Sequence, residues 1–537
     1  MTAVSAPAEE PGLPAPPPIG ESPSTGTPLV LWVAGTVTAA VFAAPLAYLV
    51  WKNVGNAGDY VDVLSEEGAW APARRSLLLA TSVAFTSALL GTLLAWLLVR
   101  SDVPGRRVLS VLAALPLVVP SFVGALALLS AFAPGGLFDL GIGRPVGFTG
   151  AFVVLTLFTY PYVYLLAAAR FASLPPDLEE AARTLGRSPA SVFRTVVLPQ
   201  SRGAIAAGAL LVFLYTLSDF GAVSLLRYDT LTTRIFSSRL ADQPASLAMS
   251  LLLAVMALVV VAAERRVQQR RIATEAVSAG RGAARAPLGV WRYPALVLVV
   301  GVLSVALVAP IAVLGQRVVR ALADGDLVVG DVLQPAWNTV WISVVAGVVA
   351  TAVVLPLAYL TTRHRSRLAG AYDVMVVSGF ALPGLVIALA MVFWVVNAPL
   401  LDSLYLTFPL LVIAYVINFG SQTLRAGQVA VSGVPERLHD AARSLGAGRA
   451  RRVASIDLPL MRSGLAAGTG LVVLSTMKEL PATLLLAPIG FQTLSTRIFD
   501  RTESLFYAEA GLAALVLIAL SGVLTWLLVI RRMDTLS

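Results

Sequence analysis

Long apolar segments alternate with short polar ones along almost the whole chain. A helix needs about 20 apolar residues to cross roughly 30 Å of hydrocarbon, and most of these segments approach or exceed that length. They lack the strict polar and apolar alternation of the strands in a membrane barrel, so the pattern predicts helices. Twelve are predicted, at residues 29–50, 76–99, 108–132, 151–169, 204–226, 247–263, 293–315, 338–360, 371–396, 404–422, 464–486 and 508–530.

The composition places the chain in a membrane. Of its 537 residues, 57% are hydrophobic and only 13% are charged, and the mean hydropathy is +0.82, far from the balance of a soluble domain. Cysteine is absent, which excludes disulfides, thiolate metal sites and cysteine nucleophiles. Residues 1–28 are rich in proline and contain no Lys or Arg, so we predict a disordered tail rather than a signal peptide.

The basic residues predict how the helices are oriented. If the N-terminus is cytoplasmic and the helices alternate in direction, 27 of the 39 Lys and Arg residues fall on the cytoplasmic side. Such an excess is typical of cytoplasmic loops in membrane proteins. Both termini are then cytoplasmic. This bias also accounts for the net charge of +9 without a nucleic-acid partner.

The second half of the sequence repeats the first. The polar segment EEAARTLG at 179–186 has a relative, HDAARSLG, at 439–446, and LTTRIF at 231–236 returns as LSTRIF at 494–499. Such a repeat indicates two copies of one structural unit. The predicted fold is an all-α polytopic membrane protein of two tandem six-helix repeats related by a pseudo-two-fold axis along the membrane normal. The predicted divisions are a tail at 1–28, a first membrane repeat at 29–263, a basic cytoplasmic linker at 264–292 and a second membrane repeat at 293–537.

Each copy of the doubled polar segment is predicted to be a cytoplasmic docking element. In the first copy, Asp177 begins a short helix that Gly186 ends, and Ser188 starts another. The alanines have almost no side-chain bulk, so another protein can approach the backbone closely. An ordinary polar hairpin is the alternative, but two occurrences at matching positions favour docking. The predicted contact residues are Glu179, Glu180, Ala181, Ala182 and Gly186 in the first copy and Asp440, Ala441, Ala442 and Gly446 in the second.

These residues resemble a known family. EEAARTLG followed by VVLPQSRGAIAAG, and HDAARSLG followed by IDLPLMRSGLAAG, resemble the EAA loop in the membrane subunits of bacterial ABC importers that depend on binding proteins. The doubled form, with SDFGAVSLL and TMKELPATLLLAP, is similar to the fused permeases of the ferric-iron importer family. The resemblance covers nearly everything from residue 76 to the C-terminus. The second copy departs from the pattern at His439 and Asp440, which predicts a different contact with the ATPase there.

The resemblance implies a transport subunit of the bacterial cytoplasmic membrane without a catalytic site of its own. Each EAA loop would enter a groove on one of two ABC ATPase subunits, and an extracytoplasmic substrate-binding protein would deliver the substrate. The chain has no Gly-Lys-Ser/Thr phosphate-binding loop, because its only lysines are Lys52 and Lys478. We therefore expect the partner subunits to use ATP, and we expect this chain to bind no cofactor or metal.

Three charged residues within predicted membrane helices are candidates for the translocation path or its gate. Asp219 occupies the place that Lys478 and Glu479 occupy in the second repeat, and charged groups at such depth usually face the protein interior or a pathway. Acidic groups would suit ferric iron, a hard cation that prefers oxygen ligands. The alternative is that Lys478 pairs with an acidic neighbour and only holds helices together.

Two arginines in the outward loops are candidates for docking the binding protein. Arg234 and Arg497 follow equivalent threonines and are predicted to pair with carboxylates on its two lobes, an arrangement that the resemblance also implies. Ordinary interfacial arginines are the alternative. The two histidines, His364 and His439, lie in arginine-rich polar loops and are predicted to be solvated surface residues.

The predicted substrate is ferric iron, with thiamine, phosphonate and polyamine as alternatives within the same family. An ion-coupled secondary transporter is a second class, but it would leave the doubled cytoplasmic segment unexplained. A membrane enzyme is a third class, for which the sequence offers no cysteine, no intramembrane histidine and no clustered metal ligands. Copurification with an ATPase distinguishes the first class from the other two.

Overall fold

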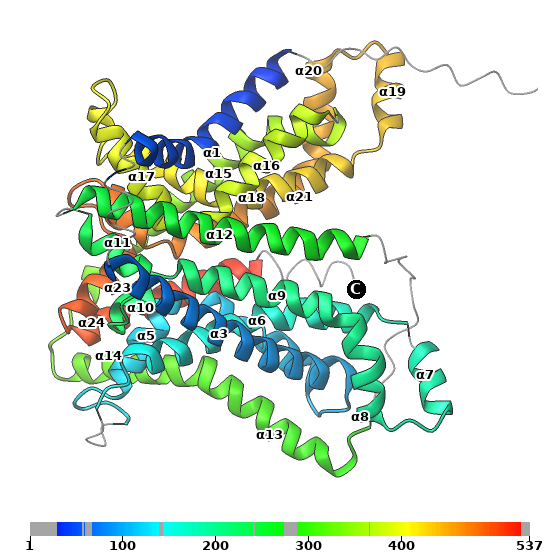
Figure 1. Ribbon diagram of the computed structural model, residues 1–537, viewed down its shortest axis with the longest axis vertical. Helices are drawn as coiled ribbons and strands as arrows, with labels where there is room; N and C mark the ends of the chain where they lie inside the picture. The colour runs from blue at the N-terminus through cyan, green and yellow to red at the C-terminus, as the bar shows by residue number, and fades with distance from the viewer. Residues whose placement is uncertain are drawn as a thin grey trace, which may run out of the picture.

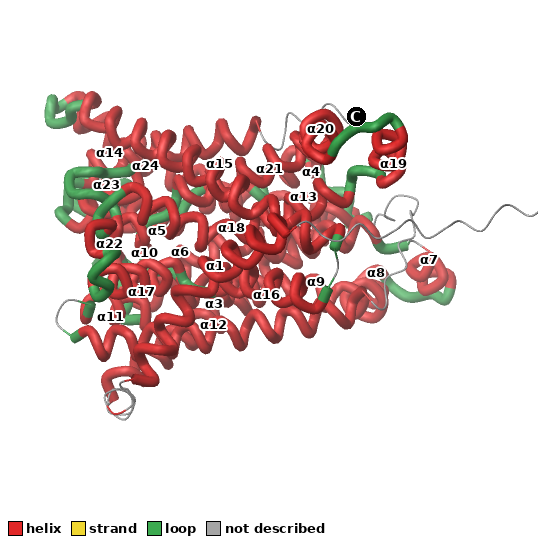
Figure 2. The backbone as a smooth tube through the Cα atoms, turned by 90° about the horizontal axis from the view of Figure 1, so that it is seen from above, coloured by secondary structure: helices red, strands yellow, loops and turns green. Residues whose placement is uncertain are grey.

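The computed structural model describes residues 29–55, 58, 67–138, 143–175, 177–239, 242–272, 287–364 and 366–527. The predicted tail at 1–28 lies outside these residues, as does much of the predicted linker at 264–292. Within them, each regular element is a helix, and the long helices run side by side (Figures 1 and 2). Two short helices, α7 (Asp177–Thr184) and α19 (Glu436–Ser444), lie at one end, and α11 (Leu231–Ser238) and α23 (Leu494–Glu503) lie at the other.

The main helices of the two repeats follow each other in matching order. The first repeat contains α1 (Leu29–Gly55), α3 (Glu67–Arg100), α4 (Arg106–Leu112), α5 (Ser121–Ala131), α6 (Gly147–Ser173), α9 (Leu198–Ser218) and α12 (Gln243–Ile272). The second contains α13 (Arg292–Leu303), α14 (Ala309–Ala323), α15 (Leu333–Arg363), α16 (Arg367–Ala381), α17 (Gly384–Val396), α18 (Phe408–Ser432), α21 (Leu458–Met477) and α24 (Tyr507–Thr525).

Fewer helices than predicted have both the length and the hydropathy of a membrane span. Among the described residues, nine helices qualify, or ten if one bent pair counts as a single span, whereas the pattern predicted twelve. The bent pair replaces the helix predicted at 108–132, with 93° between its two parts. The helix predicted at 371–396 is divided into α16 and α17. The α18 helix is long enough, but its polar residues lower its hydropathy.

Four predicted helices are broken at equivalent places in the two repeats. Pro120 and Pro383 have extended backbone and start α5 and α17, because proline has no amide hydrogen and disfavours helical backbone in the residue before it. The helices predicted at 204–226 and 464–486 end early, at Ser218 and Met477. Each is followed by a shorter helix, α10 (Gly221–Leu225) or α22 (Pro481–Leu486).

The first helix of each repeat packs on the other repeat. Helix α1 lies against α15, α16 and α17, where the hydroxyl oxygens of Thr36 and Tyr372 are 2.7 Å apart. Phe42 is buried and its ring fills the space beside Gly420, where an added Cβ would lie 2.5 Å from it. In return, α14, which with α13 forms the first span of the second repeat (Gly289–Ala323), packs against α5. The two sequence repeats are therefore not two separate packing units.

Truncation of Phe42 tests this crossed packing. Phe42→Ala leaves a cavity between α1 and the second repeat, so we expect a loss of about 3 kcal/mol in the free energy of unfolding, as for other buried Phe→Ala changes. Val37 on the same helix is 57% exposed, so Val37→Ala should cost little. Thermal unfolding of the purified protein in detergent measures both, and equal midpoints for the two variants would contradict the packing described here.

Candidate functional site

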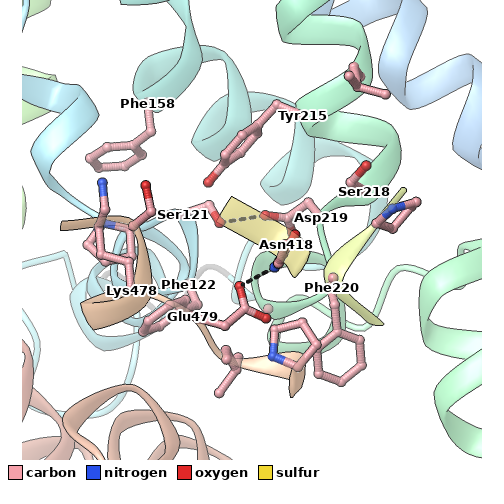
Figure 3. Close-up of a pocket in the computed structure, with 18 of the residues that line it drawn as sticks. Ser121, Phe122, Phe158, Tyr215, Ser218, Asp219, Phe220, Asn418, Lys478 and Glu479 are labelled. Carbon is pink, nitrogen blue, oxygen red and sulfur yellow. Dashed lines mark hydrogen bonds between the residues drawn. The ribbon is translucent and has the colours of Figure 1, made fainter. Parts of the chain in front are cut away.

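A cavity of about 290 Å³ lies between the two repeats, where the broken helices meet (Figure 3). Its walls include all three predicted path residues, Asp219, Lys478 and Glu479. Residues 260 positions apart face it in pairs, so that Ser218 corresponds to Lys478 and Asp219 to Glu479. The other polar side chains of the lining are Ser121, Tyr162, Tyr215, Asn418, Gln422 and Ser475.

The two carboxylates stabilise the starts of the short helices that follow the breaks. One oxygen of Asp219 accepts hydrogen bonds from the backbone N–H groups of Ala222 and Val223, at 3.0 and 3.3 Å, and the other accepts one from the Ser121 hydroxyl. Glu479 accepts a bond of 3.1 Å from the N–H of Ala482. Helix starts leave N–H groups without partners, and side-chain oxygens commonly supply them. The carboxylates thus hold the breaks in place.

Lys478 contacts the opposite repeat rather than an acidic neighbour. Its ammonium donates a hydrogen bond of 3.1 Å to the backbone carbonyl of Leu117, in the short 3₁₀ helix (Leu115–Val118) that precedes α5. Among the described residues, no carboxylate oxygen lies within 4.0 Å of this ammonium. The alternative in which Lys478 pairs with an acidic neighbour is therefore wrong.

The two doubled segments fold as matching short helices at the same end of the molecule. Helices α7 and α19 are followed by Gly186 and Gly446, each with φ +78°, a left-handed conformation that glycine adopts without strain. The leucines before them, Leu185 and Leu445, are 82% and 86% exposed. The same large apolar side chain is thus exposed at the equivalent position of both copies.

The predicted contact residues of these helices divide into exposed and buried sets. Glu180, Ala181, Gly186, Asp440, Ala441 and Gly446 are exposed, whereas Glu179, Ala182 and Ala442 are buried. The sequence analysis did not single out Leu185 and Leu445, although the Leu-Gly pair occurs in both copies. The surface offered by each helix is thus smaller and more apolar than the sequence predicted.

Glu179 anchors α7 to the membrane helices. Its carboxylate lies 2.6 Å from the guanidinium of Arg100, the last residue of α3, and the two side chains are only 4% and 2% exposed. Arg183 lies 4.0 Å from the other oxygen of Glu179. Because a buried ion pair tolerates little displacement of either partner, α7 is held to the end of α3.

The second copy uses different residues for the same purpose. At the place of Glu179, His439 has its Nε2 3.0 Å from a carboxylate oxygen of Asp457, whose other oxygen accepts a bond of 2.7 Å from the Tyr359 hydroxyl. Arg363, which ends α15 as Arg100 ends α3, pairs with Glu436 at 3.1 Å. The His439 side chain is only 17% exposed, so the prediction of a solvated histidine is wrong.

The two outward arginines have partners within the chain. Arg234 is half exposed, with its guanidinium 3.4 Å from Asp229. Arg497 is only 11% exposed and lies 3.4 Å from Glu509 and 3.8 Å from Asp331. Arg234 is therefore more accessible to solvent than Arg497. The docking role stays a prediction for both, and the exposure of Arg234 agrees with it better. In the part of the chain described here, no three His, Asp or Glu side chains gather in a group that would hold a metal ion.

Comparisons with known proteins identify both repeats. The model of a family described as "Binding-protein-dependent transport system inner membrane component" matches residues 87–273 and 344–534. The chain is 31% identical to the Fe(3+)-transport system permease protein FbpB 2 of Haemophilus influenzae over 470 residues. This match covers 84% of this chain and 88% of that protein.

Other relatives match a smaller part of the chain. The sulfate transport system permease protein CysT of Salmonella typhimurium is 33% identical over 189 residues, 34% of this chain and 68% of its own length. The molybdenum transport system permease protein ModB of Mycobacterium tuberculosis is 36% identical over 184 residues, 32% of this chain and 70% of its own.

Substitutions at Arg100 test the anchor of α7. Arg100→Ala leaves the Glu179 carboxylate buried without its partner, and we expect a loss of about 3 to 5 kcal/mol in the free energy of unfolding. The double change Arg100→Leu/Glu179→Leu removes both charges and should recover most of this loss. Arg443 pairs with Asp440 at the surface, so Arg443→Ala should cost at most about 1 kcal/mol. Thermal unfolding compares the three variants, and equal losses for Arg100→Ala and Arg443→Ala would contradict the anchor.

Proposed function

The chain belongs to the family of binding-protein-dependent transport system inner membrane components, and from this premise we propose that it forms the translocation path of an ATP-driven importer of ferric iron. Members of this family are multi-pass inner-membrane proteins without catalytic activity, and their transport depends on an ATPase and a substrate-binding protein. The proposal adds the substrate, the number of ATPase copies and the residues that couple them to the path.

The ferric-iron relative carries the substrate proposal. Its match extends over both repeats of this chain, whereas the sulfate and molybdenum relatives each match about a third of it. An oxyanion such as sulfate or molybdate is the second candidate, supported by those relatives. Thiamine, phosphonate and polyamine remain alternatives from the sequence alone.

In the proposed mechanism, α7 and α19 each dock on one of two ATPase copies. The support is the position of both helices at one end of the molecule, with Leu185 and Leu445 exposed directly after them. Closure of the ATPase dimer would then move α7 together with α3 through the Arg100–Glu179 pair. It would move α19 with the second repeat through His439 and Glu436. The two repeats would rock about the cavity between them.

The proposed path passes through the cavity, with Asp219, Lys478 and Glu479 at its gate. The helix breaks in its walls support this role, because irregular backbone at membrane depth usually lines a pathway. We further propose twelve membrane crossings, with the broken pairs and α18 counted as spans, and cytoplasmic N- and C-termini. The binding protein would then dock at the opposite end, near α11 and α23, with Arg234 and Arg497 as its proposed contacts.

Uptake of labelled ferric iron tests the substrate. Cells that lack this chain should take up iron at least about tenfold more slowly, and wild type should restore the rate. Gly186→Trp/Gly446→Trp should not restore it, since tryptophan is strained at φ +78° and obstructs the docking helices. At Gly301 on α13 no atom lies within 4 Å of an added Cβ, so Gly301→Trp is the matched control. Undiminished iron uptake in the deletion, with a fall in molybdate uptake, would overturn the iron assignment.

Copurification with the ATPase tests the docking helices. Leu185→Asp/Leu445→Asp places charges at two exposed tips, which leaves the fold intact but opposes burial in an apolar groove. We expect the amount of ATPase retained on affinity-purified chain to fall by at least about tenfold. Leu400 is 92% exposed in the loop after α17, at the end of the molecule opposite α7 and α19. The Leu400→Asp variant should therefore retain the ATPase fully. Equal retention by both variants would mean that the ATPase binds elsewhere.

A further inference from the structure

Lys478 breaks the symmetry of the cavity. It corresponds to Ser218 of the first repeat, and both side chains line the cavity. Of the described residues that line it, Lys478 is the only one with a cationic side chain. It comes from the second repeat but contacts a carbonyl of the first.

The acidic groups of the cavity are already occupied. Both oxygens of Asp219 accept hydrogen bonds, one from backbone N–H groups and the other from Ser121. One oxygen of Glu479 accepts from the N–H of Ala482, and the other lies 3.4 Å from the amide nitrogen of Asn418. An oxygen engaged in this way is a poorer ligand for a cation, because the cation would have to displace a helix-capping bond.

The ammonium of Lys478, in contrast, has more N–H donors than it has acceptors among the described residues. An ammonium carries three N–H donors, and the Leu117 carbonyl is the one acceptor within hydrogen-bonding distance among the described residues. Hydroxyl groups of Ser121, Ser218 and Tyr215 and the amide of Gln422 surround the same space. Hydroxyl and amide groups can both donate and accept, so the ammonium is the one group of the described lining that adds a positive charge and can only donate.

We propose that Lys478 is an anion contact in the translocation path, so that the permeating species presents negative charge at this point. The inference rests on the proposed function and narrows its substrate class. A bare ferric ion would meet a like charge at this point, beside carboxylates whose oxygens already accept hydrogen bonds. The species that fits is a ferric ion accompanied by anionic ligands, or an oxyanion, since both present oxygen acceptors to an ammonium.

Uptake by variants of Lys478 in the intact transporter tests the proposal. Deletion cells carry wild type, Lys478→Met, Lys478→Arg or the exchange Lys478→Ser/Ser218→Lys, and each strain receives labelled ferric citrate or labelled molybdate. For the tracer that the deletion lowers, we expect Lys478→Met to reduce the initial rate at least about tenfold, the effect of losing one charged hydrogen bond. Lys478→Arg should retain it to within about threefold, because the charge is kept.

The exchange separates an anion contact from a structural tie. It moves the ammonium to the equivalent wall of the same cavity but removes the bond to Leu117. Recovery of uptake to within about threefold of wild type supports the anion contact. Uptake as low as in Lys478→Met, at equal membrane abundance and with equal ATPase retention, overturns it and leaves Lys478 as a tie between the repeats. If Lys478→Met does not accumulate in the membrane, the uptake rate of Lys478→Ser/Ser218→Lys by itself distinguishes the anion contact from the tie.

Failure of this inference differs from failure of the proposed function. Wild-type uptake by Lys478→Met, in a strain background where the deletion abolishes iron uptake, overturns the anion contact and leaves the iron importer standing. If the deletion lowers neither tracer, the proposed substrates are wrong and the anion contact is overturned with them.

Discussion

The architecture depends on breaking helices in an apolar interior without leaving their backbone groups unpaired. Hydrocarbon supplies no hydrogen bonds, so each exposed N–H group would cost several kcal/mol. Asp219 and Glu479 meet this constraint by accepting bonds from the starts of α10 and α22, and the Lys478 ammonium satisfies a carbonyl before α5. The charged residues in the membrane helices are thus part of what makes a cavity possible there.

The same constraint explains why charge is used so sparingly elsewhere. The buried Arg100–Glu179 pair and the His439–Asp457 contact lie at the ends of long helices, where polar backbone and water are near. They join the short helices at that end to the long membrane helices. The two ends of the molecule are therefore linked by long helices, with these charged contacts at the junctions.

Much of the fold follows from local sequence, and the contacts that organise it do not. Gly186 and Gly446 predict the ends of α7 and α19 because a glycine after a helix favours left-handed backbone, and the structure has φ +78° at both. The breaks at Pro120 and Pro383 were visible as prolines, but the hydropathy pattern favoured continuous helices. The partner of Glu179 is 79 positions away and that of Lys478 is 361 away, and no local pattern encodes such a pairing. The candidate path residues could be predicted because a charged residue stands out in an apolar segment. Their hydrogen-bond partners could not be predicted.

The crossed packing of α1 also bears on biosynthesis. Thr36 meets Tyr372 across 336 positions of sequence, and at about 5 to 20 residues per second a ribosome needs roughly 17 to 70 s to make that intervening length. During this interval α1 resides in the bilayer without the surface of the second repeat on which it finally packs. Its mean hydropathy is 2.0, and only 28% of its most apolar window is buried inside the protein. Lipid can therefore solvate it until the second repeat has been synthesised and inserted.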